Sequence, residues 1–478
     1  MIQWYRFADT IIIIKSNPKT SEEDFWGFIH PVYAWILNLF DGKTEESSIC
    51  KTISCKLGVS EEVANNVIRL IKGNSSKSYL SYDGVISVIP PHVIVESNSA
   101  KREKCSDNTF IIKQPIDHKS FRWAKPRNLL ICPTLACFTD CIYCYANKKE
   151  KHVEISYRTW IRLIHQAKKN GVERIDVTGG EFFLKEGWQK IAQSLTKNGY
   201  FPDISTKIPL SKFVIDDIVD SGLKSIQFSL DTLDSIVASK TLCVDVNYTK
   251  KMQNSIRYAD LKGLKVILKP TLSVNTCNEN NLQSIFTFAS SLSNINRVVI
   301  SIIGFSNFKG HENYKKIRPS LSQICKIRSF IRDMSDKMVF PIIDDTFIYR
   351  KCEMKNASSF SNRPLCSANI DGFVILPDGN VTICEELYWN PFFQLGNIQN
   401  KSILEIWNSD KAKSLYFQNQ EKYPESSACK NCQNFIACRT KKGVCWKIIV
   451  AAYGNDNTLY PDPRCPFAPD TNVNYTID

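Results

Sequence analysis

The chain has 478 residues, of which 43% are hydrophobic and 23% are charged. This composition is typical of a folded protein with two or three domains. No apolar run is long enough to cross a bilayer, and the N-terminus lacks the apolar core of a signal peptide, so we expect a cytoplasmic protein without a membrane partner. The net charge is +13, but residues 1–100 hold nine Lys or Arg and eleven Asp or Glu. The basic excess of the remainder suits an acidic peptide or nucleic acid, and charge alone does not choose between them.

The first part of the chain, residues 1–100, is predicted to be a small α/β module. After a short strand, Pro31 marks the start of a helix. Two further helices end near Lys72, and YLSYDGVISVIP then predicts a hairpin. This order is that of a winged helix. Because the module is slightly acidic and offers no basic recognition helix, we do not expect it to bind nucleic acid.

The stretch HPVYAWILNLFDGKTEESSICKTI, residues 30–53, resembles the PqqD-like peptide-recognition domain of peptide-modifying enzymes. In that family an aliphatic and aromatic helix ends in a DGK-type turn and precedes a threonine-capped helix, which would make Thr44 the cap. The resemblance implies that the leader of a precursor peptide binds by adding a strand to the small sheet of the module.

The middle of the chain alternates between strand-like and helix-like segments. Residues 101–127 are polar and basic and are predicted to be a linker. Over 128–340 the alternation predicts a parallel sheet with helices outside it, most simply a partial (β/α)6 barrel. The strands are expected in LLICPT, RIDVTG, DISTK, SIQFSLD, KVILKPTL and RVVISIIG. In such barrels the chemistry lies at the carboxyl ends of the strands.

Three cysteines follow the first of these strands, at Cys137, Cys141 and Cys144. Eighteen cysteines in a large chain without a signal peptide indicate metal binding rather than disulfides. Closed structural sites usually have four protein ligands, whereas a [4Fe–4S] cluster on three thiolates leaves one iron open to a chelating small molecule. The C-x3-C-x2-C spacing alone also allows a zinc loop that takes a ligand from elsewhere, or a chance cluster.

The next strand ends in Gly179, Gly180 and Glu181. Glycines let the backbone approach a ligand closely, and a carboxylate can bind an ammonium group. The cysteine loop and this GGE motif together resemble the radical S-adenosylmethionine (SAM) family. The resemblance implies that Cys137, Cys141 and Cys144 hold the cluster, while the amino and carboxylate groups of SAM bind its open iron. It also implies SAM contacts from Tyr143, Gly179, Gly180, Glu181, Ser229 and Asp231.

Two of these positions have alternatives. Ser229 has the place of a SAM-contacting serine, although an ordinary strand-end hydroxyl explains it equally well. Relatives often place an arginine near position 240 to meet the SAM carboxylate, and this chain has Lys240 there. The resemblance implies that a flavodoxin- or ferredoxin-type donor reduces the cluster, that the sulfonium is cleaved, and that a 5′-deoxyadenosyl radical abstracts hydrogen from the substrate.

The last part, residues 341–478, is predicted to be cysteine-rich and stabilised by metal. A zinc ribbon is one interpretation. The order of its cysteines, with LGNI and EIW between them, resembles the SPASM domain, which carries two auxiliary [4Fe–4S] clusters and would bring the total to three. The resemblance assigns one auxiliary cluster to Cys366, Cys384 and Cys445. It assigns the other to Cys429, Cys432, Cys438 and Cys465.

Three details of this region stay open. Six residues separate Cys438 from Cys445, where the family usually has three. The first auxiliary cluster has either an open iron or Cys352 as its fourth ligand. Glu385 follows Cys384 directly, where sulfatase-maturing relatives have an aspartate base, so it is a candidate catalytic base, although a solvated surface glutamate is the more common case.

These patterns predict a radical SAM enzyme that modifies a ribosomal precursor peptide, with a cysteine thioether cross-link as the favoured product. Carbon–carbon cross-linking, epimerisation and sulfatase-maturase-like oxidation are alternatives within the class. A zinc-stabilised winged-helix regulator is the alternative from another class, and the acidic module and the GGE motif count against it. Hydrolysis and nucleoside-triphosphate use have no support, since no Ser/His/Asp set or P-loop stands out.

Overall fold

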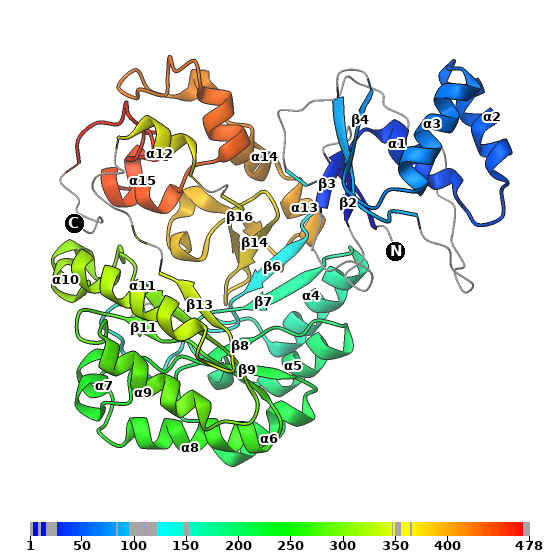
Figure 1. Cartoon of the computed structure of the whole chain (residues 1–478). Coiled ribbons are helices and arrows are strands. Elements are labelled where there is room, and N and C mark those ends of the chain that lie inside the picture. Colours follow the sequence, from blue (N-terminus) through cyan, green and yellow to red (C-terminus); the bar gives the residue numbers. More distant parts are fainter. Residues whose placement is uncertain are drawn as a thin grey trace. The chain divides into compact units, whose positions relative to one another are not determined.

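The structure is a computed structural model of the chain. It describes residues 3–7, 11–15, 26–82, 85–94, 110, 122–123, 125–147, 153–346, 348, 355–363 and 366–471. The chain divides into two compact units, Met1–Ala124 and Lys125–Asp478 (Figure 1). Most of the predicted linker, and Cys352, lie outside the described residues.

The first unit contains three helices followed by a hairpin, in the predicted order. Its elements are an antiparallel sheet of β1 (Gln3–Phe7), β2 (Ile11–Lys15) and β3 (Trp26–Ile29), helices α1 (Pro31–Leu39), α2 (Glu46–Leu57) and α3 (Glu61–Lys72), and the hairpin of β4 (Ser78–Tyr82) and β5 (Val85–Ile89). Every residue of α1 is buried, which makes this helix the centre of the core of the unit.

Two of the three helix starts in this unit have familiar sequence signals. Pro31 opens α1, and the Ser60 hydroxyl accepts a hydrogen bond from the Val63 amide at the start of α3. The expected threonine cap of α2 is wrong. The N-cap residue is Glu45, and the Thr44 hydroxyl instead donates to Asp41 at 3.0 Å, because Asp41 organises the preceding turn.

The second unit contains the predicted barrel strands, and all six form. They are β6 (Asn128–Ile131), β7 (Arg174–Val177), β8 (Ile204–Thr206), β9 (Ser225–Phe228), β10 (Lys265–Leu268) and β12 (Ile295–Ile302). Strand β6 pairs in parallel with β7, and β8, β9, β10 and β12 pair in parallel in that order. Two short strands, β11 (Thr271–Leu272) and β13 (Ile342–Asp345), add to β12. The α/β partial barrel is therefore confirmed.

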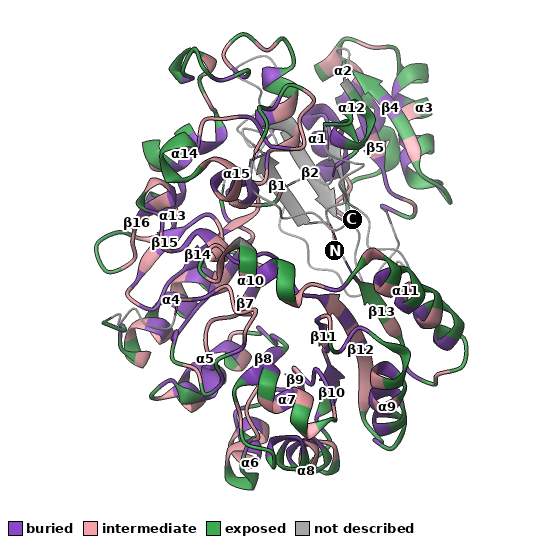
Figure 2. Cartoon of the chain, turned by 90° about the vertical axis from the view of Figure 1, so that its left-hand side faces the viewer, coloured by how far each residue is buried: buried purple, intermediate pink, exposed green. Residues whose placement is uncertain are grey.

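Helices cover the outside of this sheet, as Figure 1 shows. They are α4 (Tyr157–Lys169), α5 (Trp188–Lys197), α6 (Lys212–Asp220), α7 (Ser235–Leu242), α8 (Tyr248–Leu261), α9 (Glu279–Ser290) and α11 (Leu321–Ser335). Helix α10 (Gly310–Ile317) instead contacts the three-cysteine loop, where Asn313 donates to the Ile142 carbonyl oxygen. In α4, Trp160, Leu163, Ile164 and Ala167 are buried, which is the spacing of one helical face. Figure 2 shows the result, with buried residues toward the sheet and exposed residues outside.

The cysteine-rich part continues the barrel sheet. Strand β14 (Gly372–Ile375) pairs in parallel with β6, and β15 (Asn380–Thr382) and β16 (Gln394–Asn397) follow it antiparallel. A Cβ on Gly372 would lie 1.9 Å from the Asn128 carbonyl oxygen, so glycine is needed for this pairing. The remaining helices are short: α12 (Ala357–Ser361), α13 (Ile403–Trp407), α14 (Asp410–Tyr416) and α15 (Trp446–Tyr453). None of the helices described is long and apolar enough for a membrane span.

Candidate active site

The three-cysteine loop follows β6 at the carboxyl end of the barrel. Cys141 is buried, and Cys137 and Cys144 are half-buried. The Thr139 hydroxyl lies 3.2 Å from Cys141 Sγ and 3.6 Å from Cys137 Sγ. Neighbouring elements fix the loop backbone, since the amides of residues 140 and 142 donate to carbonyl oxygens at the end of α7. The loop is thus held in place from the barrel side.

The GGE motif packs directly on this loop. The Gly180 amide donates to the Thr134 carbonyl oxygen at 2.8 Å, and the Glu181 amide donates to that of Ala136 at 2.6 Å. A Cβ on Gly180 would lie 2.1 Å from the Ala136 oxygen, and Gly179 has a φ of +133°. Both glycines are therefore required by the close approach of two backbone segments, whatever ligand lies beside them.

Glu181 is a buried carboxylate with one oxygen to spare. It is 1% exposed, and its Oε2 accepts hydrogen bonds from the Lys207 amide at 3.0 Å and the Thr206 hydroxyl at 3.1 Å. Its Oε1 is buried and accepts no hydrogen bond of standard geometry among the described residues, while the backbone of Phe183 also stabilises the carboxylate. Burial raises the pKa of Glu181 to about 7. A buried acceptor that lacks a donor fits the amino group of SAM, which would supply one.

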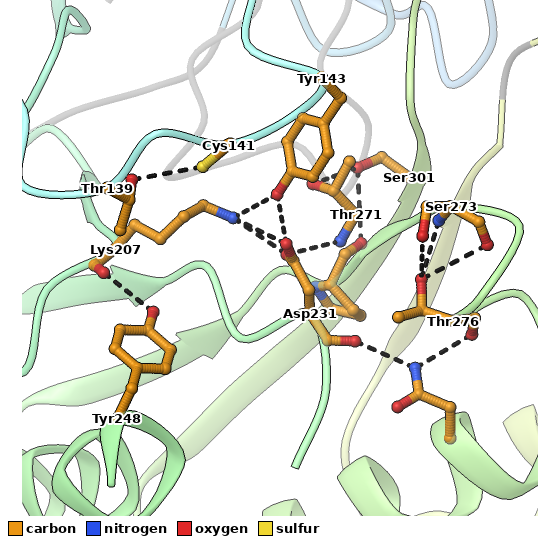
Figure 3. Close-up of polar contacts among 12 residues, drawn as sticks. Thr139, Cys141, Tyr143, Lys207, Asp231, Tyr248, Thr271, Ser273, Thr276 and Ser301 are labelled. Carbon is orange, nitrogen blue, oxygen red and sulfur yellow. Dashed lines mark hydrogen bonds and ion pairs between the residues drawn. The ribbon is translucent and has the colours of Figure 1, made fainter. Parts of the chain in front are cut away.

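A buried ion pair lies next to the cysteine loop (Figure 3). Lys207 Nζ is 3.0 Å from both carboxylate oxygens of Asp231 and 2.7 Å from the Tyr143 hydroxyl, which also donates to Asp231. Burial alone would lower the pKa of Lys207, but Asp231 and the nearby Cys141 thiolate outweigh it, so the pKa is raised. Lys207 thus stays charged, and it holds both Tyr143 and Asp231 in place.

Ser229 and Lys240 differ in their distance from this region. Ser229 is half-buried at the end of β9, and its amide donates to Thr206, whose hydroxyl binds Glu181. Lys240 is exposed in the last turn of α7. Among the residues described, no hydrogen bond or ion pair joins Lys240 to Glu181 or to the cysteine loop. The structure brings Ser229, but not Lys240, toward the predicted site.

Glu385 is half-buried between the barrel and the cysteine-rich part. Its Oε2 accepts hydrogen bonds from the Thr178 hydroxyl at 3.0 Å and the Tyr145 hydroxyl at 3.4 Å. Thr178 precedes the GGE motif, and Tyr145 follows Cys144. Burial raises the pKa of Glu385. It is therefore not a solvated surface residue, and it joins the segment after Cys384 to both halves of the predicted SAM site.

Cys366 lies against the segment that leads to Cys445, because its amide donates to the Lys442 carbonyl oxygen at 3.2 Å. Cys445 lies close enough to the other two to act on both thiols electrostatically. Burial, followed by Cys445, raises the pKa of Cys366 to about 11. A π-helical segment, Ile436–Lys442, takes up the long spacing between Cys438 and Cys445. The unusual spacing therefore does not keep Cys445 away from its expected partners.

The other four cysteines line one small pocket: Cys429, Cys432, Cys438 and Cys465. Arg363 and Arg439 each donate a hydrogen bond to a cysteine sulfur of this pocket. Within the described residues, no three His, Cys, Asp or Glu side chains are grouped so that one metal ion can bind them. A four-iron cluster holds its ligands farther apart than one ion does, because each thiolate binds a different iron.

Four residues of these sites carry no prediction from the sequence. Thr178 and Thr206 stand at the carboxyl ends of β7 and β8, so the rule for barrel strand ends would have found both. Arg363 and Arg439 have no such signal. Their positions depend on how the irregular cysteine-rich segments fold.

Comparison with known proteins supports two parts of this description. Residues 131–279 match the radical SAM superfamily, and residues 366–433 match SPASM, an iron–sulfur cluster-binding domain. Curated relatives include the probable GTP 3′,8-cyclase of Archaeoglobus fulgidus, 26% identical over 189 residues that cover 39% of this chain and 63% of that protein. The GTP 3′,8-cyclase of Campylobacter jejuni is 29% identical over 171 residues, which cover 34% of this chain and 52% of that protein. The chain thus spans between half and two thirds of these relatives.

Among solved structures, the chain is similar to Streptococcus suis SuiB. The TM-score is 0.64 at 16% identity, over 97% of this chain and 98% of that one. The SuiB structures bound to S-adenosylmethionine and to the precursor peptide SuiA give TM-scores of 0.62 and 0.63. At this identity the similarity shows the fold. The chain therefore has a radical SAM domain, with a curled parallel half-barrel, and a C-terminal SPASM domain.

Proposed function

We propose that this radical SAM and SPASM enzyme modifies a ribosomal precursor peptide, and that it forms a cysteine thioether cross-link. The observation that carries the proposal is the fold shared with SuiB over 97% of the chain, since SuiB has been crystallised with a precursor peptide. The unpartnered oxygen of Glu181 beside the three-cysteine loop supports the SAM site itself.

The residues of the barrel site have separate tasks in this proposal. Cys137, Cys141 and Cys144 would hold the cluster, and Glu181 would accept a hydrogen bond from the amino group of SAM. When bound, the cluster and SAM supply the one-electron cleavage that makes hydrogen abstraction possible. The buried pair of Lys207 and Asp231 holds the Tyr143 hydroxyl and so fixes that side of the site. A fixed, dry site protects a reactive species from water.

Formation of a thioether removes one hydrogen atom from carbon, one proton from a cysteine thiol and one electron. Glu385 is the base that we propose for the thiol proton, because it is half-buried and its pKa is raised toward neutral pH. Tyr145 and Thr178 hold its carboxylate. Cys366, Cys384 and Cys445 would hold an auxiliary cluster able to accept the electron, with an open iron or with Cys352 as fourth ligand.

We infer that the first unit binds the leader of the peptide. Within the described residues, strand β4 pairs with no strand other than β5, and on its backbone the Tyr33 hydroxyl donates to the Ser81 carbonyl oxygen. We propose that a leader peptide adds along the other edge of β4. Two large apolar side chains, Tyr79 and Ile86, are exposed on one face of this hairpin. Exposed apolar groups next to an open strand edge suit a peptide that brings its own apolar side chains.

The test is reconstitution of the full chain under anaerobic conditions with iron and sulfide, followed by reductant, SAM and synthetic peptides encoded by the short reading frames beside its gene. A thioether predicts 5′-deoxyadenosine, a peptide lighter by two hydrogens, and a cysteine that iodoacetamide no longer alkylates. A carbon–carbon cross-link leaves that thiol reactive, whereas epimerisation leaves the mass unchanged and takes up solvent deuterium.

GTP belongs in the same assay, because the curated relatives are named for a reaction of GTP. Conversion of GTP without any change in the peptides would overturn the peptide proposal and leave the radical SAM assignment intact. The Cys141→Ala variant is the control for chemistry that does not need the cluster.

A further inference from the structure

Two buried arginines border the four-cysteine pocket. Arg363 is 7% exposed and Arg439 is 2% exposed. Arg363 Nη2 lies 3.2 Å from Cys438 Sγ, and Arg439 Nη2 lies 3.2 Å from Cys429 Sγ. A guanidinium group stays protonated in proteins, so both side chains bring a full positive charge into the interior.

No carboxylate in the described part of the chain neutralises these charges. Within the described residues, neither arginine forms an ion pair with Asp or Glu. Arg363 donates to the carbonyl oxygens of Phe360 and Gly443, both at 2.7 Å, and its guanidinium lies 3.9 Å from the centroid of the Phe360 ring. The carboxylate in the pocket wall, Asp462, is paired with Arg464 at 2.6 Å.

Neutral oxygens and aromatic faces satisfy hydrogen bonds but cancel little charge. A buried charge without a counter-charge is strongly unfavourable. Nε of both arginines, and Nη1 of Arg439, also have no hydrogen-bond partner among the residues described. The pocket therefore brings together four cysteine sulfurs and two cations that lack a counter-charge. This combination suits an anionic group that the four sulfurs bind.

Arg439 lines a second pocket, which Arg363 does not line. It lines the four-cysteine pocket and also a neighbouring pocket to which Cys366 contributes. Its guanidinium lies 5.2 Å from the ring centroid of Tyr423 and 5.5 Å from that of Trp446, so aromatic rings hold it between the two sites. Arg439 thus hydrogen-bonds the four-cysteine site through Cys429 and also borders the pocket of Cys366, whereas Arg363 contacts the four-cysteine site through Cys438.

We propose that Arg363 and Arg439 are positioning residues for an anionic iron–sulfur cluster on Cys429, Cys432, Cys438 and Cys465, and that they raise its reduction potential. The inference rests on the proposed function only for the presence of this cluster. On reduction the cluster gains one electron from the added reductant, and no covalent bond forms or breaks. Hydrogen bonds to the thiolate sulfurs and nearby positive charge stabilise the reduced, more negative state.

The experiment measures reduction potentials by electron paramagnetic resonance in a Cys137→Ala/Cys141→Ala/Cys144→Ala background, which lacks the barrel cluster. Arg363→Gln and Arg439→Gln are each expected to make reduction of one cluster at least tenfold less favourable, a shift of about 59 mV to more negative potential for one electron. Arg439→Gln is also expected to shift the potential of the cluster on Cys366, Cys384 and Cys445, by a smaller amount. Arg328→Gln is the matched control. This arginine lies in α11 and also hydrogen-bonds a backbone carbonyl, that of Thr346, instead of a cysteine sulfur.

An unchanged potential in both glutamine variants, with iron content retained, would overturn the proposal. If these variants lose iron, Arg363→Lys and Arg439→Lys decide the matter, because they keep the charge. Retained iron with a potential between the wild-type value and a value about 59 mV more negative supports the proposal. Loss of iron from the lysine variants, with a wild-type circular dichroism spectrum, would show that the arginines hold the cluster in place without tuning it, and would overturn it.

Failure of the proposed function gives a different result. In that case the enzyme with all its cysteines would not modify any peptide. The arginine variants would still change the reduction potentials and the iron content of the auxiliary sites. Absence of any iron bound through the four cysteines, tested by Cys432→Ala in the same background, would instead remove the basis of the arginine inference alone.

Discussion

The three-cysteine loop and the four-cysteine pocket hold sulfur in opposite electrostatic surroundings. Beside the loop stand Glu181, with one unpartnered carboxylate oxygen, and Asp231, whose charge Lys207 already balances. Around the pocket stand Arg363 and Arg439, which have no carboxylate partner in the part of the chain described. At the three-cysteine loop, Glu181 lacks a hydrogen-bond donor. At the four-cysteine pocket, the two arginines lack an anion.

This difference teaches what each site is built to bind. Three ligands and a spare buried acceptor suit a small molecule that brings its own donor and leaves after each turnover. Four ligands and two buried cations suit a permanent charged group that never leaves. The first site is therefore expected to govern SAM cleavage, and the second to govern electron transfer.

The largest expected effect comes from removing one cysteine at each site. Cys141→Ala is expected to abolish 5′-deoxyadenosine formation, because the cluster of the barrel loses a ligand. Cys432→Ala is expected to lower the iron content while SAM cleavage without peptide persists. Iron analysis and product quantification on the same samples check this. Equal loss of SAM cleavage in both variants would erase the distinction between the two sites.

Glu385→Gln tests the residue that links the two regions. A positioned base contributes about 10²–10⁴-fold to a rate, so we expect cross-linked peptide to fall about a hundredfold while 5′-deoxyadenosine continues to form. Thr178→Val, which removes one hydrogen bond to Glu385, is expected to give a smaller loss. Parallel loss of both products would place Glu385 in SAM binding instead. Peptide mass spectrometry and 5′-deoxyadenosine measured together separate the two results.

Glu181→Gln sharpens the comparison through its pH dependence. A hydrogen bond involving a charged group contributes about 1.5–3 kcal/mol, so the variant is expected to bind SAM at least tenfold more weakly. The pKa of Glu181 is raised to about 7, so below pH 7 a proton must leave before the carboxylate can act as acceptor. Affinity is expected to fall about tenfold per pH unit below 7 and to level off above it. In isothermal titration, the SAM affinity of the Glu181→Gln variant should not depend on pH in this range. A pH dependence that persists in the variant would belong to another group.

The same raised pKa has a consequence for the protein without ligand. The folded state binds more protons than the unfolded state between the ordinary pKa of 4.5 and about 7. The contribution of Glu181 to the free energy of unfolding is therefore fully present below pH 4.5 and is lost as the pH rises through 7. SAM is expected to restore it, because the bound amino group satisfies the ionised carboxylate.

The sequence predicted the barrel well and the SPASM packing poorly, for a physical reason. Alternating strands and helices carry their burial pattern locally, as the spacing from Trp160 to Ala167 in α4 shows. The GGE and cysteine motifs likewise lie within short segments at strand ends. Arg363 and Cys438, by contrast, are 75 residues apart in the chain. Only the packed irregular segments bring them together, and no local period records that contact.

Lys240 gives the smallest expected effect and tests the resemblance at a single position. The family places a cation near here for the SAM carboxylate, but Lys240 is exposed in the last turn of α7, whereas the charged Lys207 lies beside the cysteine loop. Lys240→Met is therefore expected to change SAM affinity less than about twofold, as is usual for an exposed charge. Lys207→Met should weaken SAM binding markedly, because it leaves Asp231 buried without its partner. A large effect of Lys240→Met would mean that α7 moves when SAM binds and that the difference between the two lysines holds only without ligand.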